Sequence, residues 1–148
     1  MTIAVAESLT GGLVVAELVG VAGASKVVNG GVVAYNTALK HSLLGVDAEL
    51  LAVRGAVDPD VAAAMADGVR HACAISGIPA SIGLSTTGVA GPEPQDGKPV
   101  GTVFVAVSSD AGTRVFDLTL GGSRNELRRR VVSDSLVQLK KVLTESDT

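Results

Sequence analysis

The sequence predicts a single α/β domain of three layers, whose mixed, mostly parallel sheet is followed by a C-terminal β-hairpin and a long helix. Three observations predict this class. The 148 residues are the usual length of one domain. The composition is 47% hydrophobic but only 2% aromatic, so the core is built from Val, Ala, Leu and Ile. Short β-branched runs also alternate with segments of helical period.

The first third of the chain alternates strands with short helices. A buried apolar strand is predicted at 2–6 (TIAVA), and a second strand at 29–35 (NGGVVAY) ends at the single tyrosine. Short helices are predicted at 12–19, 37–44 and 47–53. Each strand is therefore followed by a polar or glycine-rich turn and a helix.

A longer helix is predicted to begin at Asp58 and Pro59, because Asp is a good N-cap and Pro fits the first helical turn. The helix ends before Pro79. Its apolar stripe is predicted to comprise Val61, Met65, Val69, Ala72 and Cys73.

The last part of the chain predicts three strands and the final helix. The strands are expected at 80–84, 101–108 and 114–120, with the last two joined as a hairpin through residues 110–112. Ser123 and Glu126 have the spacing of a capping box that opens the helix. The helical stripe comprises Leu127, Val131, Val132, Leu136, Leu139 and Leu143. We expect the polar tail, 144–148, to fray, and residues 1–148 to form one domain.

Charge and composition exclude several classes of partner. The formal net charge is −3 and the chain has three aromatic residues, one Tyr and two Phe, so no nucleic-acid surface is expected. No apolar run is long enough for a signal peptide or a membrane span, which favours the cytoplasm. The single cysteine, Cys73, excludes an internal disulfide and a multi-cysteine metal site. Neither a metal nor a cofactor is expected.

The stretch AESLTGG follows the first predicted strand and places polar groups at a strand-to-helix turn. Glycines at positions 11 and 12 would let an anion or a developing oxyanion approach the free N–H groups of the next helix. Ser8 would then lie beside that anion site. In the alternative interpretation, Ser8 or Thr10 is only the N-cap of the helix and the glycines form a tight turn.

Two further segments follow predicted strands, and ligands of open α/β sheets bind beyond the carboxyl ends of strands. Tyr35 and Lys40 can face these ends, and a neutral Lys40 could act as the base for a serine if burial lowers its pKa. The alternative is a solvated lysine. Residues 85–101 are predicted to form a long loop punctuated by Gly and Pro, of a length that is often functional. Neither a Walker A motif nor G-x-G-x-x-G is present.

Arg124 and Arg128 lie four residues apart at the start of the predicted final helix. They therefore share a helix face, next to the free N–H groups of the first turn. Two guanidiniums in this arrangement suit a phosphate or a carboxylate. The consecutive arginines at 128–130 point in different directions, so at least one is simply solvated.

The motifs AESLTGG, GGVVAYNTALKHSLLGV, TTGVAGPEPQDGKPVGTVFVAV and GSRNELRRRVV together resemble the CinA C-terminal domain family, in the same order along the chain. The resemblance implies hydrolysis of the carboxamide of nicotinamide mononucleotide (NMN) to nicotinate mononucleotide and ammonia, in pyridine-nucleotide salvage. It suggests Ser8 as nucleophile, Lys40 as its base and Tyr35 as a hydroxyl that orients or relays the proton. Substrate-binding residues implied by the resemblance are Glu7, Thr10, Gly11, Gly12, Thr86, Thr87, Gly88, Gly91 and Arg124.

The chain departs from the family pattern in three places. Leu9 stands where Cys is common, and Ser123 replaces a common Asp next to Arg124. The additional helix that precedes the first strand in most relatives is missing, and so is the fused nucleotide-pyrophosphatase domain of the longer ones. The uncovered apolar surface and the resemblance both favour a homo-oligomer, most simply a dimer. The alternative to an enzyme is a non-catalytic nucleotide-binding or interaction module that retains the pocket.

Overall fold

The structure, a computed structural model, describes residues 1–145 and has a five-stranded sheet at its centre. The strand order is β2-β1-β3-β4-β5. β1 pairs in parallel with β2 and β3, whereas β4 runs antiparallel to both β3 and β5. Four of these five strands therefore point the same way, which confirms the mixed, mostly parallel sheet. The strands are β1 Ile3–Glu7, β2 Val28–Val33, β3 Ile82–Gly88, β4 Thr102–Ser109 and β5 Gly112–Thr119.

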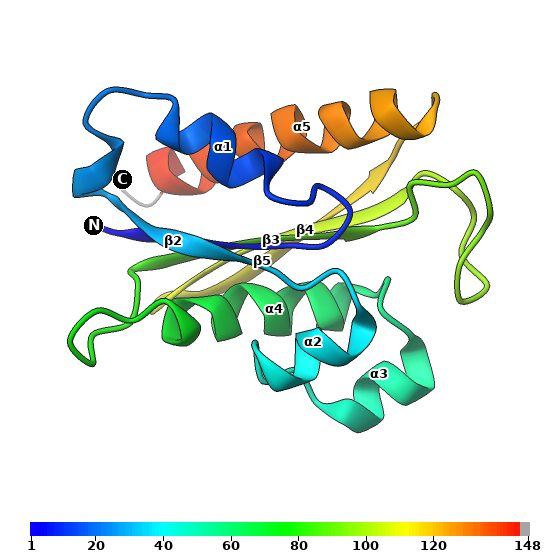
Figure 1. Cartoon of the computed structure of the whole chain (residues 1–148), viewed down its shortest axis with the longest axis horizontal. Coiled ribbons are helices and arrows are strands. Elements are labelled where there is room, and N and C mark those ends of the chain that lie inside the picture. The colour runs from blue at the N-terminus through cyan, green and yellow to red at the C-terminus, as the bar shows by residue number, and fades with distance from the viewer. Residues whose placement is uncertain (146–148) are drawn as a thin grey trace.

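Helices cover both faces of the sheet and complete the three layers (Figure 1). α1 (Leu13–Val19) and α5 (Arg124–Glu145) lie on one face. On the other face lie α2 (Thr37–Ser42), α3 (Ala48–Arg54) and α4 (Pro59–Ala72). A short 3-10 helix, Ala24–Lys26, leads into β2. The predicted α/β class is confirmed.

The two faces of β1 differ in side-chain size. Val5 of β1 packs in the core beneath α1 and α5, whereas its neighbours Ala4 and Ala6 pack beneath α4. α4 comes so close to the sheet that a Cβ built on Gly83 of β3 would lie 1.8 Å from the backbone oxygen of Ala66. Only glycine fits there, so the close packing of α4 on the sheet depends on Gly83.

α4 begins as predicted. The Asp58 carboxylate accepts hydrogen bonds from the N–H groups of Asp60 at 2.8 Å and Val61 at 3.4 Å. The predicted stripe is correct at Val61, Met65 and Val69, which are buried, and at Cys73, which is half-buried and packs against the same core cluster, but it is wrong at Ala72, which is exposed. The helix ends at Ala72, and the chain there turns away from the core through the bridge between Ile75 and Ile78.

The polar triplet Ser85, Thr86 and Thr87 lies inside β3, so the prediction that the strand ends at 84 and a loop begins at 85 is wrong. All three residues pair with β4, and Ser85 and Thr86 also pair with β1. Their hydroxyls are satisfied within the protein, for example Ser85 Oγ donates to the Ala62 carbonyl at 2.7 Å. A polar run can therefore form a central strand because each hydroxyl has a partner.

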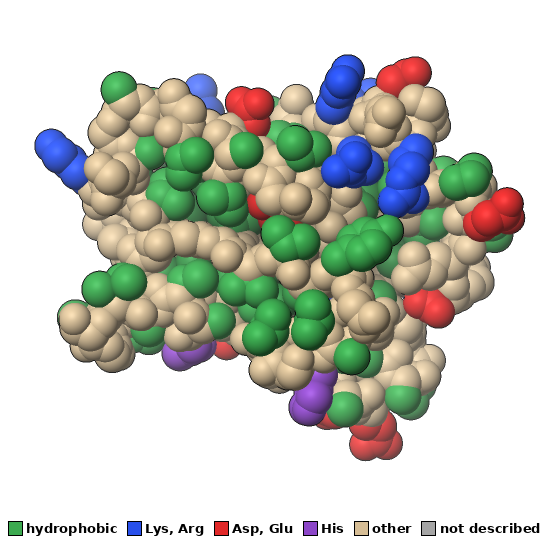
Figure 2. All heavy atoms as spheres, in the orientation of Figure 1, with side chains coloured by type: hydrophobic (Ala, Val, Ile, Leu, Met, Phe, Trp, Pro, Cys, Tyr) green, Lys and Arg blue, Asp and Glu red, His purple; other side chains and the backbone are tan. Residues whose placement is uncertain are grey.

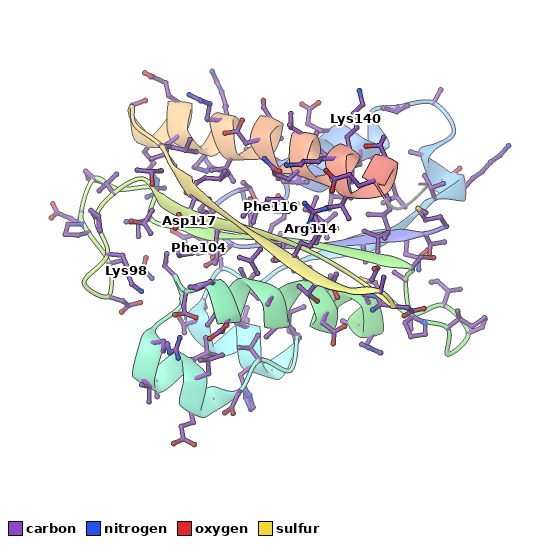
Figure 3. All side chains as sticks on the ribbon, turned by 180° about the vertical axis from the view of Figure 1, so that it is seen from behind. Lys98, Phe104, Arg114, Phe116, Asp117 and Lys140 are labelled. Atoms are coloured by element: carbon purple, nitrogen blue, oxygen red, sulfur yellow. The ribbon has the colours of Figure 1, made fainter. Side chains whose placement is uncertain are left out.

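The hairpin and the final helix are also present. Ser109 pairs with Gly112 across the two-residue turn between β4 and β5. On the edge strand β5, the guanidinium carbon of Arg114 lies over the ring of Phe116, 5.4 Å from the ring centroid. Both side chains project from β5 in the view from behind (Figure 3). Glu126 N–H donates to Ser123 Oγ at 3.3 Å, one of the two bonds of the predicted capping box. The predicted stripe of α5 packs on the core.

The end of α5 corrects one expectation. The helix continues through Glu145, so residues 144 and 145 do not fray, and the remainder of the expected frayed tail, 146–148, lies outside the described residues. Within residues 1–145, none of the helices combines the length and the apolar character needed to cross a bilayer.

Candidate active site

A cavity of about 620 Å³ opens at the carboxyl ends of β1, β2 and β3. These strand ends lie on the right in Figure 1. Five segments contribute to its wall: the turn after β1, the residues around α2, the segment before α4, the end of β3 with its loop, and the start of α5. The lining residues are Ser8, Leu9, Tyr35, Asn36, Thr37, Lys40, Ala56, Val57, Thr87, Gly88, Val89, Ala90, Gly91, Pro92, Glu93, Pro94, Gln95 and Arg124. The predicted convergence at one sheet end is therefore confirmed.

Lys40 and Ser8 form a hydrogen-bonded pair in this cavity. Lys40 Nζ lies 2.9 Å from Ser8 Oγ and donates to the Ala34 carbonyl at 2.6 Å, while the Tyr35 carbonyl is 3.5 Å away. The Lys40 side chain has 0% exposure, although lysines are almost never fully buried without an ion-pair partner. No carboxylate within residues 1–145 forms a salt bridge with it.

Burial changes the chemistry of this amine. Removal from water disfavours the ammonium form and lowers the pKa of Lys40 from its ordinary 10.5 to about 8. About a tenth to a fifth of the amine is therefore neutral between roughly pH 7 and pH 7.4, and a neutral amine can accept the Ser8 hydroxyl proton. The predicted role of Lys40 required a lowered pKa, and the pKa is lowered.

Local structure places the two members of the pair. Glu7 is in register with Val33, and Ala34 N–H donates to the Glu7 carbonyl at 2.9 Å, so the residues that follow β1 and β2 remain side by side. Asn36 caps α2 by accepting from the N–H of Ala38 at 2.9 Å. Lys40 is therefore one turn inside α2, from where its side chain reaches back to Ser8.

The turn between β1 and α1 does not work as a simple helix cap. Gly12, with φ 103°, occupies the N-cap position, and as a glycine it has no side chain that could cap the helix. Instead the buried Glu7 carboxylate accepts from the N–H groups of Val14 at 2.8 Å and Val15 at 3.1 Å. Neither Ser8 nor Thr10 is the N-cap, so the alternative interpretation of these residues is wrong.

The oxyanion donors were expected among the free N–H groups at the start of α1, and the position of the Glu7 carboxylate shows that this expectation is wrong. Because the carboxylate occupies N–H groups of the first turn of α1, these donors are not free to bind an anion. The turn itself has other donors: within residues 1–145, the N–H groups of Leu9 and Thr10 have no backbone or side-chain acceptor at hydrogen-bond distance. Leu9 lines the cavity together with Ser8.

The predicted substrate-binding residues divide into two groups. Thr87, Gly88, Gly91 and Arg124 line the cavity together with the predicted catalytic residues. Glu7, Thr10, Gly11, Gly12 and Thr86 lie behind it and shape the turn. For example, Thr10 Oγ1 and Thr86 Oγ1 share a buried hydrogen bond of 2.8 Å.

Tyr35 follows β2 rather than ending it, and its side chain is 61% exposed. Its hydroxyl accepts from Arg124 Nη2 at 3.1 Å, and no hydrogen bond joins it to Ser8 or Lys40 in the part of the chain that the structure describes. Arg124 also donates to the Gly91 carbonyl. The three residues thus bridge the rim of the cavity, so the side chain of Tyr35 is placed for substrate contact more directly than for proton relay.

The loop after β3 is tied to the segment before α4, a contact that sequence reasoning missed. Asp96 accepts from the N–H of Ala56 at 3.3 Å, and Lys98 Nζ donates to the Val57 carbonyl at 2.7 Å. Thr87 Oγ1 donates to the Ala56 carbonyl at 2.7 Å. These bonds use the backbone of two small apolar residues, which leave no signal in the sequence.

Basic side chains gather over the start of α5 (Figure 2), the part of the helix that carries Arg124 and the arginines 128–130. Arg128 donates through Nε to the Leu9 carbonyl at 2.7 Å. The shared face of Arg124 and Arg128 is therefore confirmed, although only Arg124 lines the cavity. Within residues 1–145, no cluster of three or more His, Cys, Asp or Glu side chains could hold a metal ion.

Comparisons with known proteins agree with this architecture. The CinA C-terminal domain model matches residues 1–143. A CinA-like protein of Frankia casuarinae is 47% identical over 96% of this chain, and a putative competence-damage inducible protein of Desulforamulus reducens is 46% identical over 97%. These alignments cover 32% and 34% of the two relatives, so the chain spans about a third of their length.

Solved structures give the same assignment. The competence/damage inducible protein CihA from Agrobacterium tumefaciens superimposes with a TM-score of 0.87 at 34% identity, over 95% of this chain and 84% of that one. A CinA superfamily protein from Klebsiella pneumoniae 700603 gives a TM-score of 0.90 at 29% identity, over 97% and 88% of the two chains. Sequence, fold and family model all agree: the chain belongs to the CinA C-terminal domain family.

Proposed function

We propose that this domain is an amidohydrolase that converts NMN and water into nicotinate mononucleotide and ammonia, with Ser8 as nucleophile and Lys40 as base. The observation that carries the proposal is the buried Lys40 amine, 2.9 Å from Ser8 Oγ in an open cavity. A buried, unpaired lysine lowers stability, and such groups are concentrated at functional sites. A serine activated by an adjacent lysine is a recognised nucleophile of amide hydrolysis.

The chemistry can be followed through these two groups. Ser8 Oγ forms a bond to the carboxamide carbon while its proton moves to Lys40 Nζ. The tetrahedral oxyanion that results requires N–H donors, for which the unpaired N–H group of Leu9, a residue that lines the cavity, is a candidate. Collapse of this intermediate breaks the C–N bond, and Lys40 returns the proton to the departing ammonia.

Hydrolysis of the acyl-enzyme repeats the sequence with water. Lys40 accepts a proton from the water as its oxygen attacks the ester carbon, and Ser8 recovers a proton when the carboxylate product leaves. One water is consumed and one ammonia is released per cycle. No metal or organic cofactor takes part in these steps.

The cavity provides suitable surroundings for a nucleotide. Its volume of about 620 Å³ lies in the range of small-molecule sites. Leu9, Val57 and Val89 contribute apolar surface that suits a pyridine ring. Arg124 at the rim still has N–H groups beyond those that contact Gly91 and Tyr35, and a guanidinium suits the 5′-phosphate.

The direct test is ammonia release from NMN, nicotinamide riboside and nicotinamide by the wild type and by the Ser8→Ala and Lys40→Met variants. We expect NMN to be preferred and each substitution to lower kcat by about 10³-fold or more. The double variant should be no slower than either single one, because the two groups act as a unit. Lys140→Met, on the exposed face of α5, is the matched control and should retain wild-type kcat.

Binding is measured separately from turnover. Ser8→Ala should keep the rise in Tm that NMN gives the wild type, because removal of the hydroxyl leaves the rim intact. Equal rates of ammonia release in the wild type and both variants would refute the mechanism. A rise in Tm with NMN but no turnover by the wild type would instead identify a non-catalytic nucleotide-binding module.

A further inference from the structure

Two segments of the cavity wall are joined to each other by side chains that do not themselves line the cavity. Ala56 and Val57, between α3 and α4, form one of these segments. The Ala56 N–H donates to Asp96 Oδ2 at 3.3 Å, and the Val57 carbonyl accepts from Lys98 Nζ at 2.7 Å. Both partners belong to the loop after β3, which supplies the second segment, residues 92–95.

The tip of this loop has a defined shape. Gln95 and Lys98 exchange two backbone hydrogen bonds, of 3.1 and 2.8 Å, around a two-residue turn. The turn residues Asp96 and Gly97 have φ values of 51° and 73°, as in a type I′ turn, and Asp is one of the residues that tolerate this conformation. Lys98 lies at the tip, on the side of α3 and α4 (Figure 3). The turn therefore presents both side chains to the segment before α4.

Gly55 provides the surface on which the tip rests. A Cβ built on Gly55 would lie 2.5 Å from Asp96 Oδ2, 2.6 Å from Cγ and 2.7 Å from Cβ. Rotation of the carboxylate alone could not relieve these contacts, because they extend to the Cβ of Asp96. A larger residue at position 55 would therefore displace the backbone of the loop.

The loop is held at its base as well as at its tip. At the base, Arg124 at the start of α5 donates to the Gly91 carbonyl. At the tip, the loop is bonded to the segment before α4, on the other face of the sheet. Residues 92–95 lie between these two attachments and line the cavity.

We propose that Asp96 and Lys98 are positioning residues for substrate binding, which hold residues 92–95 and the segment before α4 together as a fixed wall of the cavity. The loop clasp is the name used below for their hydrogen bonds to Ala56 and Val57. A wall that is ordered before the substrate arrives lowers the entropic cost of binding. The inference rests on the proposed function, because it assigns this wall to the site that binds NMN.

The first test removes the ammonium group of the clasp. For NMN hydrolysis we expect Lys98→Met to raise KM about 10-fold with kcat changed less than about threefold, because the ordering of a few side chains on binding has about this cost and the clasp takes no part in the chemical step. Lys98→Arg should recover part of the loss, since its guanidinium can still donate to the Val57 carbonyl. Lys140→Met, on the exposed face of α5, should match the wild type.

The second test displaces the loop tip without a change to the loop itself. Gly55→Ala should raise KM about as much as Lys98→Met. Gly77→Ala is the matched control: Gly77 also has a φ of 77°, but no heavy atom of the described residues lies within 4 Å of its built Cβ. The two alanine variants therefore carry similar backbone strain and differ in the contact with Asp96. The control should retain the wild-type KM.

Hydrogen exchange without substrate measures the clasp directly. The Ala56 N–H is bonded to Asp96, and the Gln95 N–H is bonded within the tip. We expect both amides to exchange about 10-fold or more faster in Lys98→Met and Gly55→Ala than in the wild type, because release of the tip exposes them to water. In Lys140→Met and Gly77→Ala both exchange rates should stay as in the wild type.

The outcomes separate this inference from the proposed function. Faster exchange with a raised KM supports the clasp. Unchanged exchange overturns it, and so does faster exchange with unchanged KM, which would make the contacts merely structural. A wild type that binds NMN without turnover refutes the hydrolase but still tests the clasp, with the Kd from thermal shifts in place of KM. A wild type that neither hydrolyses nor binds NMN overturns both. Thermal unfolding verifies each fold, and Lys98→Met decides if Gly55→Ala does not fold.

Discussion

The burial of Lys40 should couple its protonation to the stability of the fold. Its pKa is about 8 in the folded protein and 10.5 in a solvated chain, and at about 1.4 kcal/mol per pH unit this difference corresponds to about 3 kcal/mol. Well below pH 8 the lysine is protonated in both states, so the folded state bears the whole free-energy cost of burying the ammonium group. Between pH 8 and 10.5 the unfolded chain holds more protons, so the stability rises with pH.

Lys40→Met isolates this effect because it removes the titrating group and keeps an unbranched apolar side chain. We expect the free energy of unfolding of the wild type, relative to that of Lys40→Met, to increase by about 1 kcal/mol between pH 7 and 9 and by about 3 kcal/mol in total above pH 10.5. Urea unfolding at each pH measures both proteins. A difference between the two proteins that stays constant from pH 7 to 10 would show that Lys40 titrates normally and would refute the reasoning.

The same titration should control catalysis. If neutral Lys40 is the base, kcat/KM for ammonia release rises about tenfold per pH unit below pH 8 and levels off above it. The measurement covers pH 6 to 9.5 in buffers of constant ionic strength. A flat profile across pH 6.5–9, or a midpoint near 10, would exclude Lys40 as the base at neutral pH.

Three further substitutions test the parts of the structure that support the site. Glu7→Gln keeps one acceptor for the first turn of α1 and should lower the free energy of unfolding in urea by about 2 kcal/mol; a loss below about 0.5 kcal/mol would show that the two carboxylate bonds contribute little. Gly83→Ala places a methyl group 1.8 Å from a backbone oxygen of α4 and should cost about 3 kcal/mol or more, whereas Gly121→Ala, with no atom within 4 Å, should change stability by less than about 0.5 kcal/mol; similar Tm values for the two variants would contradict the tight packing of α4. Tyr35→Phe removes a contact with Arg124, so KM for NMN should rise a few-fold with kcat nearly unchanged, and a 100-fold fall in kcat would instead support a proton relay.

The sequence was sufficient to predict the fold class, the hairpin, the long final helix and the convergence of Ser8 and Lys40, because each of these depends on local patterns and on the direction of parallel strands. Residues 85–87 were misassigned because their polar character favours a loop. Inside the strand their hydroxyls are satisfied only by long-range partners: Ala62 on α4, Ala56 before it and Thr10 in the turn after β1.

The role of Glu7 was missed for a related reason. The familiar capping patterns place the acceptor at the N-cap, whereas this carboxylate lies inside β1 and reaches seven and eight residues ahead. The complete burial of Lys40 likewise depends on the layers packed around α2, which local sequence does not encode. The contact between Arg128 and Leu9 joins opposite ends of the chain, and no spacing rule could have predicted it.

The pairing of β1 with β2 has a consequence for how this protein can be monitored as it folds. Ser8 and Lys40 follow two different strands, and the alignment of Glu7 with Val33 is what brings their ends level. A slip of two residues in this parallel pair would keep every side chain on its face of the sheet but move the two strand ends apart by about 6–7 Å. Such a misaligned protein would keep its secondary structure and much of its compactness, yet Ser8 would lie beyond hydrogen-bond reach of Lys40. Under the proposed mechanism, the reactivity of Ser8 would therefore report the alignment of an edge strand, which circular dichroism and molecular size do not detect.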